Sequence, residues 1–287
     1  MQDSLEYVKF VLPILVLFAA FFLFPFVQGL LYSFTNWNSL SKSPTYVGLS
    51  NYLTAFKDQD FQSAVGFTLY FTLIYVVAVN VLAVFLALIL SRPMSSAGAL
   101  RATLFAPYIL NVVTIGFIWQ FIFGQFFTTL GEHTKFFLFG ITWLGDAKVV
   151  PYTVAIVKTW QSVGYFMILY IAGLQMIPGE LYEAATIDGA GGSARFRHIT
   201  LPLLMPSVTI GVFLAIVSGM TIFPLILTLT GGGPGIASTS ISMYLYTVAF
   251  SQQRFGYGSA LAVLFVIMML IISLLQLKVF RKREVNE

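Results

Sequence analysis

The sequence predicts an all-α membrane protein with six transmembrane helices. Hydrophobic residues make up 58% of the 287 residues and charged residues only 9%, whereas soluble globular chains carry about 25% charged residues. Several uncharged apolar runs exceed the roughly 20 residues that a helix needs to cross a bilayer. Helices are expected because every backbone N–H and C=O group must find a partner inside lipid.

Six segments are apolar enough to cross the membrane. The first, Phe10–Phe34, is longer than the roughly 7–15 apolar residues of a signal peptide, so we expect it to be retained as a span. The others are expected within Phe61–Leu90, from after Arg101 to near Thr129, from about Pro151 to Gln175, from after Pro206 to the glycines and proline at Gly231–Pro234, and over Tyr257–Leu277.

The lysines and arginines predict the orientation. With six spans, nine basic residues lie inside and five outside, and Lys158 within the fourth span completes the 15. Basic residues are enriched in cytoplasmic loops, so both termini are expected inside. Segment 236–253 is uncharged and is an alternative seventh span, but that arrangement would move the C-terminal basic cluster outside.

The pattern predicts three regions along the chain. We expect an N-terminal helix with an external loop at 1–60, a transmembrane core at 61–280 and a cytoplasmic tail at 281–287. The net charge of +4 does not indicate nucleic-acid binding, because the basic residues lie at the ends of apolar runs and form no single patch.

The residues of an enzyme active site are not found. The chain has no cysteine and only two histidines, His133 and His198, which argues against a metal centre. It contains no GxxxxGK[ST] motif for ATP. The run Gly189-x-Gly191-x-x-Ala194 imitates a dinucleotide fingerprint, but no strand precedes it. We therefore expect no catalytic residue, no metal and no cofactor on this chain.

The acidic residues bear on the class of transporter. With six spans, all 11 Asp and Glu residues lie in loops or tails. Carriers driven by protons place carboxylates within the membrane, so a secondary transporter is the weaker alternative.

The most specific segment is a cytoplasmic loop of about 30 residues between the fourth and fifth predicted spans. Pro178 suits a first helical turn, and Glu180 and Glu183 place negative charge near the positive N-terminal end of a helix. We expect a short helix that continues to Ile187.

Glycines then interrupt this helix, beginning with Gly189. Ser193 is expected to cap a second short helix that extends toward Ile199. Pro202 and Pro206 are expected to redirect the chain into the fifth span.

This loop resembles the EAA-x3-G-x9-I-x-L-P motif of bacterial ABC importer permeases at every defined position. The matching residues, with the adjacent Asp188, are Glu183, Ala184, Ala185, Asp188, Gly189, Ile199, Leu201 and Pro202. Further matches at Leu229–Pro234, Tyr244–Phe250 and Phe255–Tyr257 resemble the first-permease branch of the carbohydrate importers. The resemblance extends from about Phe61 to Phe280.

The resemblance implies a type I ABC importer permease fold in which the loop forms a coupling helix. Glu183 would hold the loop or pair with an ATPase, Ala184 and Ala185 would form a close-packed face, and Gly189 would allow the turn. The alternative is that the loop only stabilises the cytoplasmic end of the helix bundle.

The resemblance also implies a function, namely the permease subunit of an ATP-driven carbohydrate importer in a bacterial or archaeal cytoplasmic membrane. The implied partners are a second homologous permease, a cytoplasmic ABC ATPase dimer that binds ATP and Mg²⁺, an extracellular or periplasmic solute-binding protein, and a sugar-like substrate. The alternatives are import of another small polar solute, such as glycerol phosphate, and a non-transporting membrane scaffold.

Neutral polar and aromatic residues within the spans are candidates for the substrate path, because sugars need hydrogen bonds and aromatic surfaces. These candidates are Trp160, Gln161, Tyr165, Ser218, Gly219 and Thr221. Trp160 and Tyr165 fall at positions that resemble sugar contacts of the maltose-type permease, whereas Gly219 and Ile222 replace asparagines of that family. The alternatives are anchoring at the lipid interface and helix packing.

Lys158 is the single charge within the fourth predicted span. We expect its side chain to extend to the outer interface. The alternative is contact with an anionic substrate.

Overall fold

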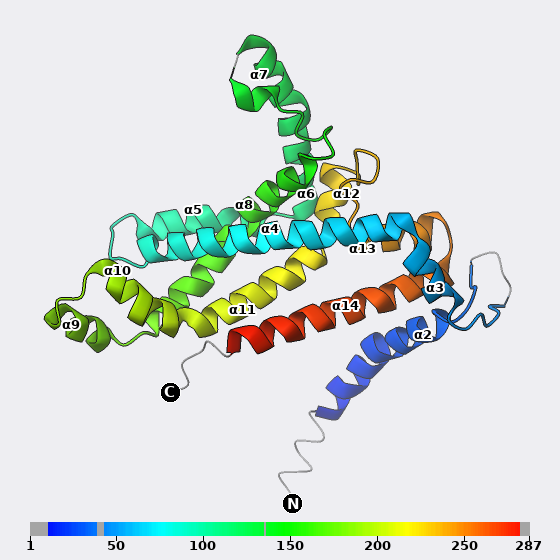
Figure 1. Cartoon of the computed structure of the whole chain (residues 1–287), viewed down its shortest axis with the longest axis horizontal. Helices are drawn as coiled ribbons and strands as arrows, with labels where there is room; N and C mark the ends of the chain where they lie inside the picture. The colour runs from blue at the N-terminus through cyan, green and yellow to red at the C-terminus, as the bar shows by residue number, and fades with distance from the viewer. Residues whose placement is uncertain (1–10, 39–42, 135, 282–287) are drawn as a thin grey trace, which may run out of the picture. The chain divides into compact units, whose positions relative to one another are not determined.

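The computed structural model describes residues 11–38, 43–134 and 136–281. Six of the helical segments are long and apolar enough to cross a membrane (Figure 1). They are Val11–Tyr32, Gln59–Leu90, Val112–His133, Val150–Gln175, Gly192–Met220 and Phe255–Phe280. The predicted all-α class with six transmembrane helices is confirmed. Of the predicted tail, only Arg281 lies within the described residues.

Several spans consist of shorter helical elements joined end to end. In chain order, the elements are η1 (Ala19–Leu23), α2 (Phe24–Tyr32), α3 (Ser50–Lys57), α4 (Gln59–Leu90), α5 (Ala97–Ile109), α6 (Val112–Phe121), η2 (Ile122–Phe126), α7 (Phe127–His133), η3 (Phe137–Gly140), α8 (Val150–Gln175), α9 (Gly179–Ile187), α10 (Gly192–Arg195), η4 (Phe196–Thr200), α11 (Leu201–Met220), α12 (Pro224–Leu229), α13 (Ile241–Tyr246), η5 (Thr247–Ser251) and α14 (Phe255–Arg281).

The third span begins at Val112, so the predicted start after Arg101 is wrong. Helix α5 ends before Leu110, whose backbone is extended with ψ 145°. Asn111 then caps α6, because its side chain accepts a hydrogen bond of 2.8 Å from the N–H of Val113. The apolar run continues across this break, so hydropathy alone does not reveal it.

The start of the fifth span also differs from the prediction. The helix runs over Gly192–Met220, with Pro202 near the start of α11 and Pro206 inside it. The helical run continues through both prolines, with the π-helical turn η4 directly before Pro202, and a membrane helix can accommodate such prolines. Gly191, in place of the predicted Ser193, is the N-cap.

This span ends at Met220, earlier than predicted, and the chain continues as the short helix α12 at Pro224–Leu229. Gly231 and Gly232 follow with φ of +61° and +87°, values that favour glycine. The apolar helix Ile241–Ser251 has fewer than 18 residues and is not among the six spans. The alternative seventh span is therefore not supported.

The chain divides into two compact units, one formed by 1–61 with 244–268 and the other by 62–243 with 269–287. In the first unit, Asp58 lies just before α4 and connects three helices. Its Oδ1 accepts hydrogen bonds from the N–H groups of Asp60 and Phe61 at 3.1 and 3.2 Å. Its Oδ2 accepts hydrogen bonds from the hydroxyls of Tyr244 and Tyr257 at 2.7 and 2.6 Å.

These contacts favour the charged form of Asp58. Partial burial raises the pKa of the carboxyl, but the hydrogen bonds from Tyr257, Tyr244 and the two N–H groups outweigh it and hold the pKa below its ordinary value. The charged carboxylate is thus a structural part of the first unit.

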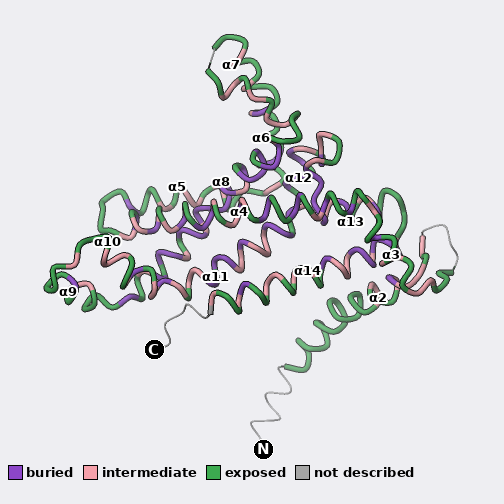
Figure 2. Tube along the Cα trace, in the orientation of Figure 1, coloured by how far each residue is buried: buried purple, intermediate pink, exposed green. Residues whose placement is uncertain are grey.

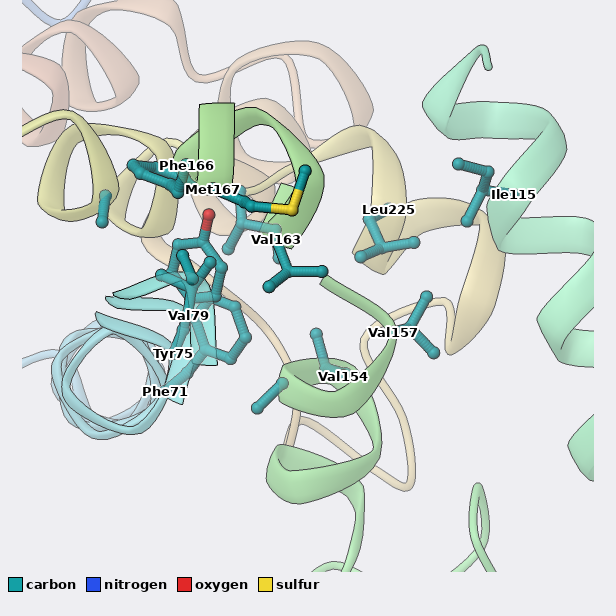
Figure 3. Packing of buried hydrophobic residues seen from close by; sticks show 14 of the residues in the cluster. Phe71, Tyr75, Val79, Ile115, Val154, Val157, Val163, Phe166, Met167 and Leu225 are labelled. Atoms are coloured by element: carbon teal, nitrogen blue, oxygen red, sulfur yellow. The ribbon is translucent and has the colours of Figure 1, made fainter. Parts of the chain in front are cut away.

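In the second unit, α8 is the most buried span: 67% of the residues in its most apolar stretch of 18 are buried (Figure 2). It packs against α5, α11 and α12. Phe71 and Tyr75 of α4 extend toward Phe166 and Met167 of α8 in the centre of this unit (Figure 3).

A glycine allows α5 and α8 to approach closely. A Cβ atom on Gly164 would lie 2.1 Å from the carbonyl oxygen of Leu104 on α5. This clash is with the backbone, so a larger residue would force the two helices apart. Small residues at such crossings are typical of helix packing in membranes.

We expect Asp58→Asn to lower the thermal midpoint of the purified protein, because the neutral amide removes charge-assisted hydrogen bonds worth about 1 kcal/mol together after solvent screening. The folded-state pKa is lowered, so this stabilisation is present above the ordinary pKa of about 4 and is lost as the pH falls through the lower value. Thermal melts should therefore show a deficit at pH 7 that shrinks near pH 3. Asp60→Asn is the control, and an equal deficit in both variants would contradict the role of Asp58.

We expect Gly164→Ala to destabilise the second unit by about 1–3 kcal/mol, because the added methyl group forces α5 away from α8. Gly98 on α5 is the matched control, since nothing lies within 4 Å of its Cβ position. Gly98→Ala should be neutral or stabilising because alanine favours helix. Thermal melts in detergent compare the two, and equal midpoints would exclude the close contact.

Candidate functional site

The loop between the fourth and fifth spans contains the predicted short helix, α9, over Gly179–Ile187. Pro178 is its N-cap residue and Glu180 lies in its first turn. After the helix, Gly189 adopts φ +72°, and its N–H donates a hydrogen bond of 3.1 Å to the carbonyl of Thr186. A β-carbon is strained in this conformation, so glycine is needed to turn the chain.

Helix α9 is held on one side by contacts within the loop. The hydroxyls of Tyr182 and Thr200 lie 3.0 Å apart, and Arg195 donates a hydrogen bond of 3.3 Å to the hydroxyl of Thr186. Ala185 is the buried residue of the helix. Tyr182 occupies a position that the sequence motif leaves undefined, so this anchor is not among the predicted residues.

The opposite side of α9 is open. Leu181, Ala184 and Ile187 follow a helical spacing that places them together, and all three are exposed, Ile187 to 87%. Glu183 is also exposed. Ala184 and Ala185 therefore do not share one face, because Ala185 packs within the chain while Ala184 remains available for another protein.

The other motif residues continue from this helix. Asp188 is the C-cap residue of α9 and is exposed. Ile199 lies in the π-helical turn η4, and Leu201 and Pro202 begin α11. The motif thus covers α9 and the base of the fifth span, and the two are joined through Tyr182.

Three of the predicted path residues lie in a polar cluster around Tyr75 of α4. The hydroxyl of Tyr75 lies 2.9 Å from that of Ser162, and Ser218 lies near the same hydroxyl. Gly219 lies against Tyr75, so a Cβ there would be 3.2 Å from the ring. Gln161 is buried next to Ser162. Tyr75 is not among the predicted residues, because nothing in the apolar run of α4 distinguishes it.

Lys158 belongs to the same cluster. Its Nζ lies 3.3 Å from Oε1 of Gln161 and 6.0 Å from the centroid of the Tyr75 ring. Gln161 is one helical turn further from the nearer end of α8, so the expected extension of Lys158 to the interface is not observed. A lysine in the centre of a membrane helix costs about 2.5–3.5 kcal/mol on insertion scales.

The predicted aromatic residues form separate pairs. Trp160 is 41% exposed and meets Trp119 edge to face at 5.4 Å, and Tyr165 stacks on Tyr108 at 4.7 Å. Trp160 also lines an apolar groove of about 530 Å³ between α4 and α8. Thr221 belongs neither to the polar cluster nor to the aromatic pairs. Its hydroxyl donates a hydrogen bond of 2.8 Å to the carbonyl of Val217 in α11.

Several buried polar atoms near these groups lack a hydrogen-bond partner. Within the described part of the second unit, they are Thr72 Oγ1, Trp119 Nε1, Thr159 Oγ1 and Gln276 Oε1. Such atoms are costly to leave unpaired. Three of them, on α4, α6 and α8, lie on the helices that contain the polar cluster and the aromatic pairs. Among residues 11–38, 43–134 and 136–281, no three acidic or histidine side chains could together hold a metal ion.

Comparison with known proteins identifies relatives along nearly the whole chain. A starch degradation products transport permease of Thermoanaerobacterium thermosulfurigenes is 34% identical, covering 99% of this chain and 97% of that protein. A multiple sugar-binding transport permease of Streptococcus mutans is 36% identical, with 96% and 95% covered. The trehalose/maltose transport permease of Thermococcus litoralis is 32% identical, with 96% and 93% covered.

The fold has a solved counterpart. A chain of a bacterial ABC transporter that imports the acidic polysaccharide alginate matches with a TM-score of 0.83 at 22% identity, over 98% of this chain and 96% of that chain. The model of the binding-protein-dependent transport system inner membrane component matches residues 79–285. With six apolar helices, this is a multi-pass protein of the cytoplasmic membrane. The chain therefore belongs to the family of binding-protein-dependent transport system inner membrane components.

Proposed function

We propose that this chain is the permease subunit of an ATP-driven carbohydrate importer. The observation that carries the proposal is the similarity over at least 96% of the chain to permeases for starch degradation products, multiple sugars and trehalose or maltose. Such a subunit needs a surface that contacts the ATPase and residues that line the substrate path. The open face of α9 is suited to the first, and the polar cluster of the spans is suited to the second.

Coupling takes place through α9. The exposed Leu181, Ala184 and Ile187 form an apolar surface that insertion into a cleft of a cytoplasmic ATPase covers. Tyr182 and Thr200 transmit the motion of the docked helix to α11, because their hydroxyls join the two. ATP and Mg²⁺ bind to that ATPase, and this chain contributes no catalytic residue and binds no cofactor.

The permease works in an assembly. A second homologous permease completes the translocation path, an ATPase dimer docks on the cytoplasmic side, and a solute-binding protein delivers the sugar from outside. Both termini and α9 lie in the cytoplasm. Closure of the ATPases on ATP switches the path from one side of the membrane to the other.

The test combines purification with transport. This chain should co-purify in mild detergent with an ATPase and a second permease, and cells with the full complex should accumulate a saccharide. Gly189→Val should abolish uptake at unchanged membrane levels, because a β-branched residue cannot adopt φ +72° without strain. Glu183→Lys should do the same by reversing the charge next to the docking face.

Controls come from the same chain. Gly191 has a negative φ of −70° and no atom within 4 Å of its Cβ position, so Gly191→Ala should transport normally. Normal uptake by both Gly189→Val and Glu183→Lys would contradict the coupling role. Uptake of glycerol phosphate or another small solute in place of sugars would show that the substrate is not a carbohydrate. A complex that assembles but takes up no solute would indicate a scaffold.

Trp160→Ala should raise the KM for sugar uptake about two- to tenfold if the ring stacks on the substrate, because aromatic stacking contributes roughly 0.5–1.5 kcal/mol. Trp160→Phe keeps an aromatic face and should recover most of the loss. Uptake kinetics for several sugars provide the measurement. Unchanged kinetics for all of them would assign Trp160 to packing against Trp119.

A further inference from the structure

Lys158 is a cation whose described contacts are with neutral groups, Gln161 and the ring of Tyr75. It lies on α8, which has no acidic residue, and neither does the adjacent α11. The acidic residue of α4 is Asp60, which lies in the first turn of that helix. Over the described ranges, no carboxylate forms an ion pair with its ammonium group. A charge inside a membrane protein normally pairs with another charge or marks a path for a substrate.

The side chain is directed into the bundle. Lys158 lies eight residues after Val150, at about 12 Å from that end of α8 with a rise of about 1.5 Å per residue. The ammonium contacts Gln161, one turn deeper, and lies over the ring of Tyr75. A lysine that served as an interface anchor would extend in the opposite direction.

The cluster leaves donor capacity unused. An ammonium group has three N–H donors, and the described residues supply one acceptor, Oε1 of Gln161. Stability does not explain why a charge is kept here, because replacing a buried charge by an apolar side chain of similar volume is often neutral or stabilising. Lys158 is itself only half-buried, so part of its side chain stays open to a ligand beside α8.

We propose that Lys158 binds an acidic group of the transported saccharide, a carboxylate, sulfonate or phosphate. The amide oxygen of Gln161 accepts a hydrogen bond from the ammonium, and the hydroxyl of Ser162 lies one turn along α8, where it donates to the backbone carbonyl of Lys158. These polar groups beside the charge suit the sugar hydroxyls next to the acidic group. The inference rests on the proposed carbohydrate import and narrows its substrate to acidic sugars.

The test uses the complex purified with its partner subunits and reconstituted in proteoliposomes with ATP. The probe is an equimolar mixture of neutral disaccharides and disaccharides that carry a carboxylate, sulfonate or phosphate, and mass spectrometry measures what accumulates. We expect an acidic disaccharide. Lys158→Met, which keeps the length of the side chain, should lower its uptake at least about tenfold, the loss expected for a hydrogen bond to a charged group.

Two variants separate this role from a structural one. Lys158→Arg retains the charge and should keep uptake within about threefold of wild type. Lys148→Met removes an exposed lysine outside the helix and should have no effect. The ratio of acidic to neutral uptake is the decisive readout, because a general loss of folding lowers both equally.

Each outcome decides a different point. Accumulation of a neutral disaccharide alone, or of an acidic one that Lys158→Met leaves unchanged, would overturn the role of Lys158 and leave carbohydrate import intact. An assembled complex that accumulates no saccharide would overturn the proposed function and this inference with it.

Discussion

Close approach of helix backbones at small residues is the constraint on which the second unit depends. Apolar side chains gain little by leaving lipid for one another, so membrane helices associate where small residues allow dense packing. At Gly164 a Cβ would lie 2.1 Å from the carbonyl oxygen of Leu104, and at Gly211 one would lie 2.1 Å from the hydroxyl of Tyr170. These contacts hold α8 between α5 and α11. The position of α8 in turn decides which of its side chains face the interior.

The two sides of α8 differ in chemistry as a consequence. Gln161 and Ser162 are buried toward Tyr75, where hydroxyls and one ammonium group gather. Trp160, one residue earlier, is exposed in an apolar groove. Because helical neighbours project about 100° apart, adjacent residues serve different surfaces. Hydrogen bonding and aromatic contact are therefore separated between the two sides of this helix.

Outside the spans, α9 combines a fixed side with a free one. The bond between Tyr182 and Thr200 and the burial of Ala185 hold the helix to the base of α11. Ile187 is 87% exposed, and Leu181 and Ala184 beside it are also exposed. The helix thus presents an apolar face while one hydroxyl contact joins it to the residue that precedes α11.

Composition and periodicity determined the six apolar helices, the short helix of the loop and the glycine turn at 189, because length, hydropathy and a positive φ each leave a local signature. Local signals failed at the break before Val112 and along Gly192–Met220, where capping by Asn111 and tolerance of Pro206 depend on context. The tertiary structure alone decided that Tyr75 joins the polar cluster, that Lys158 turns inward and that Ala185 is buried while Ala184 is exposed. Such pairings join residues far apart in the chain, and only the packing of one helix on another brings them into contact.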